Sequence, residues 1–202
     1  MEGNIILAFG LTLFAGLSTG VGGLIAVFSK KTNKKLLSVA LGFSAGVMIY
    51  VSFMEIMPKA IEAITTYYGS EQIGNWLGVA AFFAGILLIG VIDKLVPSHE
   101  NPHELYVQED IKDKDSIKEF KKLKNVGVMT AIAIAIHNFP EGFATFLGTL
   151  ADPSIGVAIA IAIAIHNIPE GLAVAIPIFY ATGSRSKALG YSLFSGLVEP
   201  LG

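Results

Sequence analysis

The sequence lacks cysteine, has few charged residues and has no excess of basic residues. The absence of cysteine among its 202 residues excludes disulfides, thiolate nucleophiles, cysteine-ligated zinc and iron–sulfur clusters. The charged fraction is 15%, against about 25% in an average globular domain, so a soluble enzyme domain is not expected. The net charge of −2 provides no basic face for a nucleic acid. A mean hydropathy of +0.65 and 22 glycines instead indicate closely packed membrane helices.

Long apolar runs fill most of the chain. A transmembrane helix needs about 20 mainly apolar residues, and five runs meet this length while a sixth reaches the end of the sequence. The predicted spans cover residues 5–28, 36–57, 76–96, 126–150, 155–180 and 188–202. The alternating Ile and Ala residues at 132–136 have no polar side and lie inside a run too long for a strand, so we interpret them as helical. The predicted fold is therefore an all-α membrane protein with one transmembrane domain.

The basic residues predict the orientation of these spans. Of the 14 Lys and Arg residues, all but Lys59 lie in or beside the connections 29–35, 97–125 and 181–187. Because cytoplasmic loops carry an excess of Lys and Arg, these connections are expected in the cytoplasm and the N-terminus outside. The N-terminus has no positively charged segment before its first apolar run, so that run is interpreted as a span and not as a cleaved signal peptide.

The connection 97–125 differs sharply from the rest of the chain in composition. It is rich in Asp, Glu and Lys, a mixture that cannot bury a core, and we predict a mobile cytoplasmic loop. His99 and His103 lie near glutamates at its start. These two histidines could capture a metal weakly, and a solvated linker is the alternative interpretation.

Ionisable residues within membrane spans are costly and usually functional. Apart from Asp93 and Lys94 at the end of the third span, the predicted spans contain six: Glu55, His137, Glu141, His166, Glu170 and Glu199. Four of them belong to a repeated phrase, because His-Asn-x-Pro-Glu-Gly occurs at 137–142 and again at 166–171. Including the preceding Ile-Ala residues, ten of eleven positions are identical at an offset of 29 residues.

The spacing within each copy has a direct geometric meaning. His and Glu four residues apart lie on the same face of a helix, one turn apart. The proline of each copy removes a helical N–H donor, which frees the carbonyl of Ile136 or Ile165. A freed carbonyl inside a membrane must be satisfied by protein, water or a ligand. Gly142 and Gly171 allow another helix to approach closely. Each copy is therefore a candidate for one side of a cation site.

Two such helices together supply nitrogen and oxygen ligands without sulfur. The candidate ligands are His137, Asn138, Glu141, His166, Asn167 and Glu170. This set suits zinc, iron(II), manganese or cobalt, and its number of donors is compatible with two ions bridged by the carboxylates. Glu199, followed by Pro200, repeats the carboxylate beside a proline and could complete the site. The alternative is that these residues form buried polar pairs that hold helices together.

Two further features near the start of the chain are open to more than one interpretation. Glu55 precedes Pro58 near the outer end of the second span and is either a metal-entry or site ligand or an interfacial carboxylate. The glycine pairs 16/20 and 42/46 are small-residue packing motifs, for which packing in the core is favoured over dimerisation.

These motifs resemble the ZIP (Zrt/Irt-like) family of divalent metal transporters, and most of all its bacterial ZupT-type members. The positions that carry the resemblance are His137, Asn138, Glu141, His166, Asn167, Glu170 and Glu199. The resemblance implies a helical bundle of eight spans, a binuclear metal site and transport of zinc, and also iron, manganese, cobalt and cadmium, towards the cytoplasm. It further implies the inner membrane of a bacterium, a homodimer, no enzymatic activity and no resident cofactor. On this comparison the chain is C-terminally incomplete, with spans seven and eight missing.

The functional hypothesis is uptake of a divalent cation by alternating access through the intramembrane His/Asn/Glu site. One alternative is a membrane protein or sensor that binds metal without moving it. A second alternative, an intramembrane metalloprotease, would require His-Glu-x-x-His on one helix, and the order here is His-x-x-x-Glu.

Overall fold

In the computed structural model of this chain the described residues are 2–29, 34–95 and 117–202, and every regular element among them is a helix. The α-helices are α1 (Glu2–Phe28), α2 (Lys34–Val51), α3 (Met57–Tyr68), α4 (Glu71–Leu95), α5 (Ile117–Ala151), α6 (Pro153–Thr182) and α7 (Arg185–Gly196). A π-helical turn, η1 (Ser52–Ile56), joins α2 to α3, and a 3-10 turn, η4 (Glu199–Leu201), follows α7. The prediction of an all-α membrane protein is confirmed.

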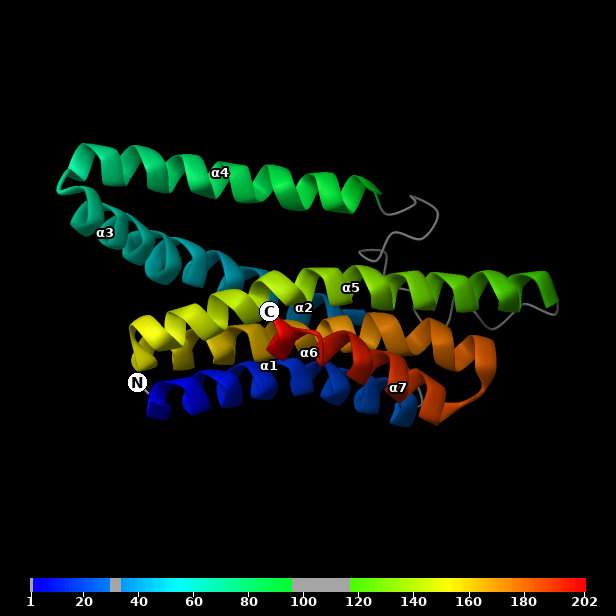
Figure 1. Cartoon of the computed structure of the whole chain (residues 1–202). Helices are drawn as coiled ribbons and strands as arrows, with labels where there is room; N and C mark the ends of the chain where they lie inside the picture. The colour runs from blue at the N-terminus through cyan, green and yellow to red at the C-terminus, as the bar shows by residue number, and fades with distance from the viewer. Residues whose placement is uncertain (1, 30–33, 96–116) are drawn as a thin grey trace.

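The helices form two regions of different packing (Figure 1). The first, called the bundle, consists of α1, α5, α6, α7 and η4, with α6 in contact with α1, α5 and α7. The second, called the arm, consists of α2, η1, α3 and α4. The arm meets the bundle where α2 packs against α6. The helix α4 packs mainly against α3 and, in Figure 1, runs roughly along α5 but set apart from the bundle. The main apolar core therefore lies within the bundle, around Val174, Ile178 and their neighbours on α1, α5 and α7.

Glycines set the close approach of helices in the bundle. A Cβ added at Gly142 would overlap the backbone carbonyl of Glu199, and one at Gly171 would overlap that of Thr19. The prediction that these two glycines admit a neighbouring helix is confirmed. Gly16 likewise lies against the backbone of Gly196, so the packing predicted for this motif on α1 is confirmed.

The corresponding prediction for the glycine pair of α2 is wrong for the described part of the chain. A Cβ at Gly42 or Gly46 would have no neighbouring atom within 4 Å. The reason is the rotation of α2, which turns Ser44, Val47 and the residues beyond them towards α6 instead. Gly42 and Gly46 therefore lie on the outer surface of α2.

The second span extends further than predicted. The sequence predicted a helix over 36–57 and a connection over 59–75, but the helix continues through η1 and α3 to Tyr68. Pro58 does not end it, because a proline in the first turn of a helix has no N–H bond to lose. The helix ends instead at Gly69, whose left-handed φ of 67° closes the last turn with a hydrogen bond to the carbonyl of Thr65.

The predicted loop 97–125 is also corrected at its end. Residues 117–125 belong to α5, so they are helical, while residues 96–116 lie outside the described residues. His99 and His103 fall in that segment. The sixth predicted span, 188–202, begins within α7, whose twelve residues start at Arg185, and ends with η4.

Within the described residues, four segments are long and apolar enough to cross a membrane. They are Asn4–Phe28, Ser38–Tyr68, Glu71–Val91 and Pro153–Thr182. The helix α5 is 35 residues long but is not among them. The six-span topology therefore stays a prediction.

Candidate metal centre

The two copies of the repeated motif meet because of the turn between α5 and α6. The two helices are joined at Asp152, which caps α6 by accepting hydrogen bonds from the backbone N–H of Ser154 at 2.9 Å and its hydroxyl at 2.7 Å. So short a connection makes the helices antiparallel neighbours. Since His137 and His166 lie at nearly equal distances along the chain from this turn, they stand opposite each other in the packed pair.

Both helices continue through the prolines inside the motifs, so each His and Glu stay on one face. The Nε2 atom of His137 lies 3.2 Å from Oε1 of Glu141, and Nε2 of His166 lies 3.2 Å from Oε1 of Glu170. The pairs also approach each other across the two helices. His137 Nε2 is 4.0 Å from Glu170 Oε1, and His166 Nε2 is 3.9 Å from Glu141 Oε1. The four side chains therefore form one group.

This group has the composition of a metal site. Within residues 2–29, 34–95 and 117–202, one set of three or more His, Asp or Glu side chains offers ligand atoms within 4.8 Å of one another, namely His137, His166 and Glu170. Glu141 joins it through its contacts with both imidazoles. Its Oε2 atom and that of Glu170 are buried and have no hydrogen-bond partner in the structure. Because buried carboxylate oxygens normally have partners, this arrangement fits a bound cation.

The two asparagines of the motif face away from the imidazoles, towards α1 and α7. The side-chain amide of Asn167 donates to the carbonyl of Ala15 at 3.0 Å and to Oε2 of Glu199 at 2.7 Å. The amide of Asn138 donates to the carbonyl of Ser195 at 3.1 Å. Each side-chain amide group therefore donates to oxygen atoms outside α5 and α6, and its buried Oδ1 atom has no hydrogen-bond partner. Both oxygens are available as ligands.

Glu199 lies beside this layer and is completely buried. Its backbone packs on Gly142, and its charge is close enough to Glu141 and Glu170 to interact with both. Its second carboxylate oxygen, Oε1, is buried without a hydrogen-bond partner. The sequence placed Glu199 at the site through its neighbouring proline, its location in a predicted span and the family resemblance, and the structure brings it to the asparagine side of the His/Glu group.

The structure does not bring every predicted residue to this group. Glu55 lies in η1, is half-buried and is not a member of the cluster. Conversely, sequence reasoning missed Ser44, whose Oγ atom lies 2.9 Å from Nδ1 of His166. No local pattern marks Ser44, because its contact depends on how α2 is rotated against α6.

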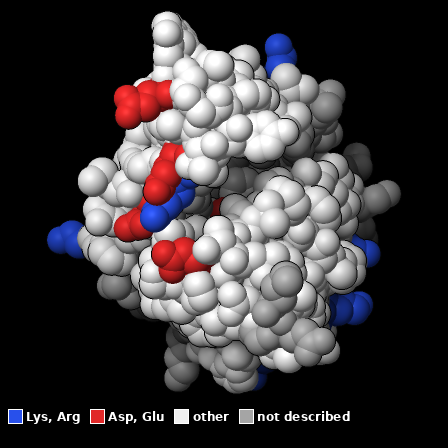
Figure 2. All heavy atoms as spheres, turned by 60° about the vertical axis from the view of Figure 1, so that its left-hand side comes forward, with Lys and Arg blue, Asp and Glu red and all other residues white. Residues whose placement is uncertain are grey.

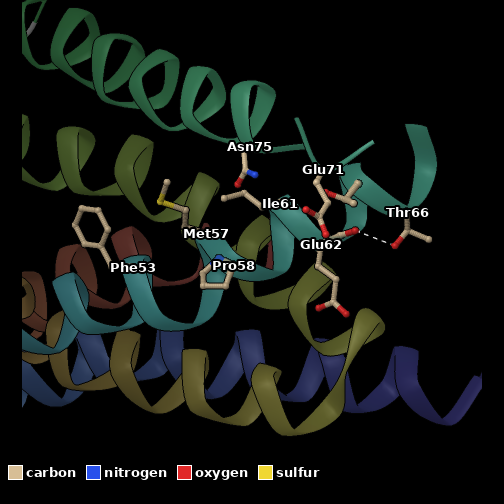
Figure 3. A pocket seen from close by; sticks show the side chains of 9 residues that line it. Phe53, Met57, Pro58, Ile61, Glu62, Thr66, Glu71 and Asn75 are labelled. Atoms are coloured by element: carbon tan, nitrogen blue, oxygen red, sulfur yellow. Dashed lines mark hydrogen bonds between the residues drawn. The ribbon is translucent and has the colours of Figure 1, made fainter. Parts of the chain in front are cut away.

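A separate cavity lies in the arm, between α3 and α4, with a volume of about 580 Å³ (Figure 3). None of the candidate ligands lines it. Its wall combines Phe53, Met57 and Ile61 with the acidic Glu62 and Glu71. Figure 2 shows acidic side chains gathered around a hollow at this end of the molecule, where Lys59 pairs with Glu62 at 3.6 Å. The cavity is thus distinct from the metal group.

A helical membrane protein with a half-buried His/Glu group between two long helices belongs, by fold and site, to the class of membrane metal-binding proteins and transporters. Comparison with known proteins specifies the family. The family model of the ZIP zinc transporter matches residues 3–117 and 97–202. The chain therefore belongs to the ZIP family.

Curated relatives match over the whole chain. A zinc transporter ZupT of Nitratidesulfovibrio vulgaris is 59% identical over 207 residues, which cover 100% of this chain and 74% of the relative. The zinc transporter ZupT of Oceanobacillus iheyensis is 62% identical over 199 residues, covering 98% of this chain and 74% of the relative. No solved structure matches the chain. The resemblance predicted from the motifs is confirmed, and the chain is a transporter of divalent metal ions and not an enzyme.

Proposed function

We propose that this chain takes up zinc towards the cytoplasm through the site between α5 and α6. The proposed principal ligands are His137, Glu141, His166 and Glu170, supplemented by Asn138, Asn167 and Glu199. The observation that carries the proposal is that two copies of one motif, 29 residues apart on consecutive helices, bring two imidazoles and two carboxylates together in one half-buried group. The zinc named for the relatives agrees with this ligand set.

The distances support a zinc ion at this place. Ligand atoms about 2.0–2.1 Å from a tetrahedral zinc ion lie about 3.3–3.4 Å apart. The four nitrogen-to-oxygen distances in the group range from 3.2 to 4.0 Å. Small side-chain movements would therefore bring the ligands to coordination distance. The carboxylates neutralise the ion, which reduces the cost of holding it in a medium of low dielectric constant.

The oxygen atoms on the other side of Glu141 and Glu170 support a second ion. The Oδ1 atoms of Asn138 and Asn167 and the Oε1 atom of Glu199 are buried without hydrogen-bond partners. Oxygen ligands suit manganese and iron(II) as well as zinc, and nitrogen ligands suit cobalt. The proposal therefore includes a binuclear site bridged by the two glutamates and a substrate range that extends to iron, manganese, cobalt and cadmium.

The proposed direction of transport rests on the family resemblance, and the proposed orientation rests on the basic residues. The positions of the basic residues support connections 29–35, 97–125 and 181–187 in the cytoplasm and the N-terminus outside. In this orientation the α3–α4 turn and the α5–α6 turn face outwards. We further propose alternating access, a location in the inner membrane of a bacterium, and assembly as a homodimer.

Zinc flux into sealed proteoliposomes, followed by a zinc-sensitive dye inside, tests the function. The wild type should show influx above empty vesicles, and Glu170→Ala should abolish it. Glu62→Ala is the matched control, because Glu62 is an exposed acidic residue of α3 outside the metal group. Zinc binding without influx would instead support a metal-binding membrane protein or sensor. Influx that persists in Glu170→Ala would contradict the assigned site.

A further inference from the structure

Ser44 is a polar residue of the arm that is buried, and none of the metal ligands proposed above accounts for its burial. Ser44 is 2% exposed, while the residues at 41–43, 45 and 46 on either side of it are all exposed. It lies on the same face of α2 as Val47, Met48 and Val51, which pack against apolar residues of α6. Ser44 is thus a polar residue on an otherwise apolar contact face.

The hydrogen bond of Ser44 accounts for its place there. A hydroxyl group buried without a partner is costly, and Ser44 Oγ has its partner 2.9 Å away in Nδ1 of His166. The two ring nitrogens of His166 therefore face different groups, and only Nδ1 has a hydrogen-bond partner. Nδ1 faces Ser44, and Nε2 faces Oε1 of Glu170 at 3.2 Å.

We infer that Ser44 is a positioning residue for His166, an inference that rests on the proposed function. Its hydroxyl accepts a hydrogen bond from Nδ1–H, which orients the ring and leaves the lone pair of Nε2 for zinc. Histidine ligands generally donate their other ring N–H to such a partner, and the partner fixes the tautomer and the ring orientation. The arm thereby contributes to a metal site whose ligands all lie in the bundle.

The inference concerns α2 as a helix as well as one side chain. The apolar residues of α2 hold it against α6, but apolar contacts are not directional and do not fix the orientation of the imidazole ring. The hydrogen bond of Ser44 supplies that direction. A displacement of α2 relative to α6 would therefore alter the orientation of His166 and the zinc affinity together.

Zinc titration of the full chain in detergent micelles tests the inference with four variants. Ser44→Ala should raise the dissociation constant for zinc about 10- to 100-fold, the usual effect of removing such a partner. Ser44→Thr, which keeps the hydroxyl, should restore binding to near the wild-type value. Ser38→Ala removes an exposed hydroxyl from the same helix and should have no effect. Glu170→Ala, as the ligand control, should lose binding.

Nitrogen NMR of ¹⁵N-histidine protein gives a readout that a merely structural role would not change. With four histidines in the chain, the His166 resonances can be assigned by their loss in His166→Gln. In the zinc-loaded wild type, we expect His166 to carry its proton on Nδ1 and zinc on Nε2. Zinc on Nδ1 would overturn the inference even where Ser44→Ala does not fold.

The outcomes separate this inference from the proposed function. Equal zinc affinity of the wild type and Ser44→Ala, with binding lost in Glu170→Ala, would overturn the role of Ser44 alone. The same loss in Ser44→Ala and Ser44→Thr would also overturn a role of the hydroxyl. Absence of zinc binding by the wild type, or unchanged binding by Glu170→Ala, would overturn the proposed site and this inference with it.

Discussion

The bundle and the arm contain equally apolar helices but bury them to different extents. The most apolar stretches of α1 and α6 have mean hydropathies of 1.9 and 1.8, and those of α2–α3 and α4 have 1.7 and 1.9. In α6 61% of that stretch is buried within the protein, whereas in each of the two arm segments 11% is buried. Hydropathy therefore does not determine which helices pack tightly.

Small residues and polar side chains account for the difference. Lipid is as apolar as leucine, so close backbone contact and hydrogen bonds drive helix association in a membrane. The bundle has Gly16, Gly142 and Gly171 against neighbouring backbones, while Gly42 and Gly46 of the arm touch nothing described. Among the residues that the structure describes, the buried polar side chains also lie in the bundle, with Ser44 as the one exception.

The largest expected effect is a loss of zinc affinity. It should follow from replacing a glutamate of the bundle and not from replacing a glutamate of the arm. Glu141→Ala should weaken zinc binding at least about 100-fold, because removing a ligand should cost no less than removing a residue that supports one. Glu55→Ala should change the affinity less than about threefold, since Glu55 is outside the metal group. Isothermal titration in detergent measures both. A comparable loss in Glu55→Ala would place a ligand in the arm.

The second prediction compares a glycine at a helix contact in the bundle with a glycine on an open surface of the arm. Gly142→Ala should destabilise the protein by about 1–3 kcal/mol or more, because the new methyl group would overlap the backbone of Glu199. Gly42→Ala should be neutral or stabilise by up to about 1 kcal/mol, since alanine favours a helix and has open space there. Thermal unfolding in detergent, followed by size-exclusion chromatography, compares them. Equal destabilisation would mean that α2 is packed on both faces.

The third prediction concerns the hydrogen bond between Asn167 and Glu199. Asn167→Leu should cost about 1–3 kcal/mol, because it removes the donor to a buried carboxylate. Glu199→Gln leaves a neutral acceptor, so the same asparagine substitution should cost less in that background. A double-mutant cycle on the unfolding temperature measures the coupling. Additive effects would show that the two side chains do not interact in the folded protein.

The smallest effect is expected at the turn between α5 and α6, and it depends on pH. Hydrogen bonds from the hydroxyl and backbone N–H of Ser154 lower the pKa of Asp152 below its ordinary value of 3.8. The charged cap therefore contributes its full stability above pH 3.8 and loses it as the pH falls through the lowered pKa. Asp152→Asn keeps an acceptor without this titration. Unfolding temperatures of both proteins should differ slightly at pH 6 and converge as the pH falls below the lowered pKa of Asp152; a constant difference would refute the linkage.

The residues that could be predicted from sequence are those whose placement depends on a single helix. His137 and Glu141 share a face through their spacing alone, and the same holds for His166 and Glu170. Identical copies on consecutive spans then made their meeting predictable. The contact of Ser44 with His166 depends on the mutual rotation of two helices distant in sequence, which no local pattern encodes.

Two further departures have local causes. Pro58 resembled a helix end, but its place in the first turn of α3, after the π-helical η1, lets the helix continue to Tyr68. Gly42 and Gly46 have the spacing of a packing motif, yet spacing does not specify which face of α2 meets a neighbour. Both errors arise in the arm, where few tertiary contacts constrain the helices.

The most direct test of the central claim is a zinc anomalous difference map from crystals grown with zinc. The account predicts a peak between α5 and α6, about 2.0–2.1 Å from Nε2 of His137 and of His166, with Glu141 and Glu170 around it. A second, weaker peak towards Asn167 and Glu199 would agree with a binuclear site. A peak in the arm, beside Glu62 and Glu71, with none between α5 and α6, would contradict the account.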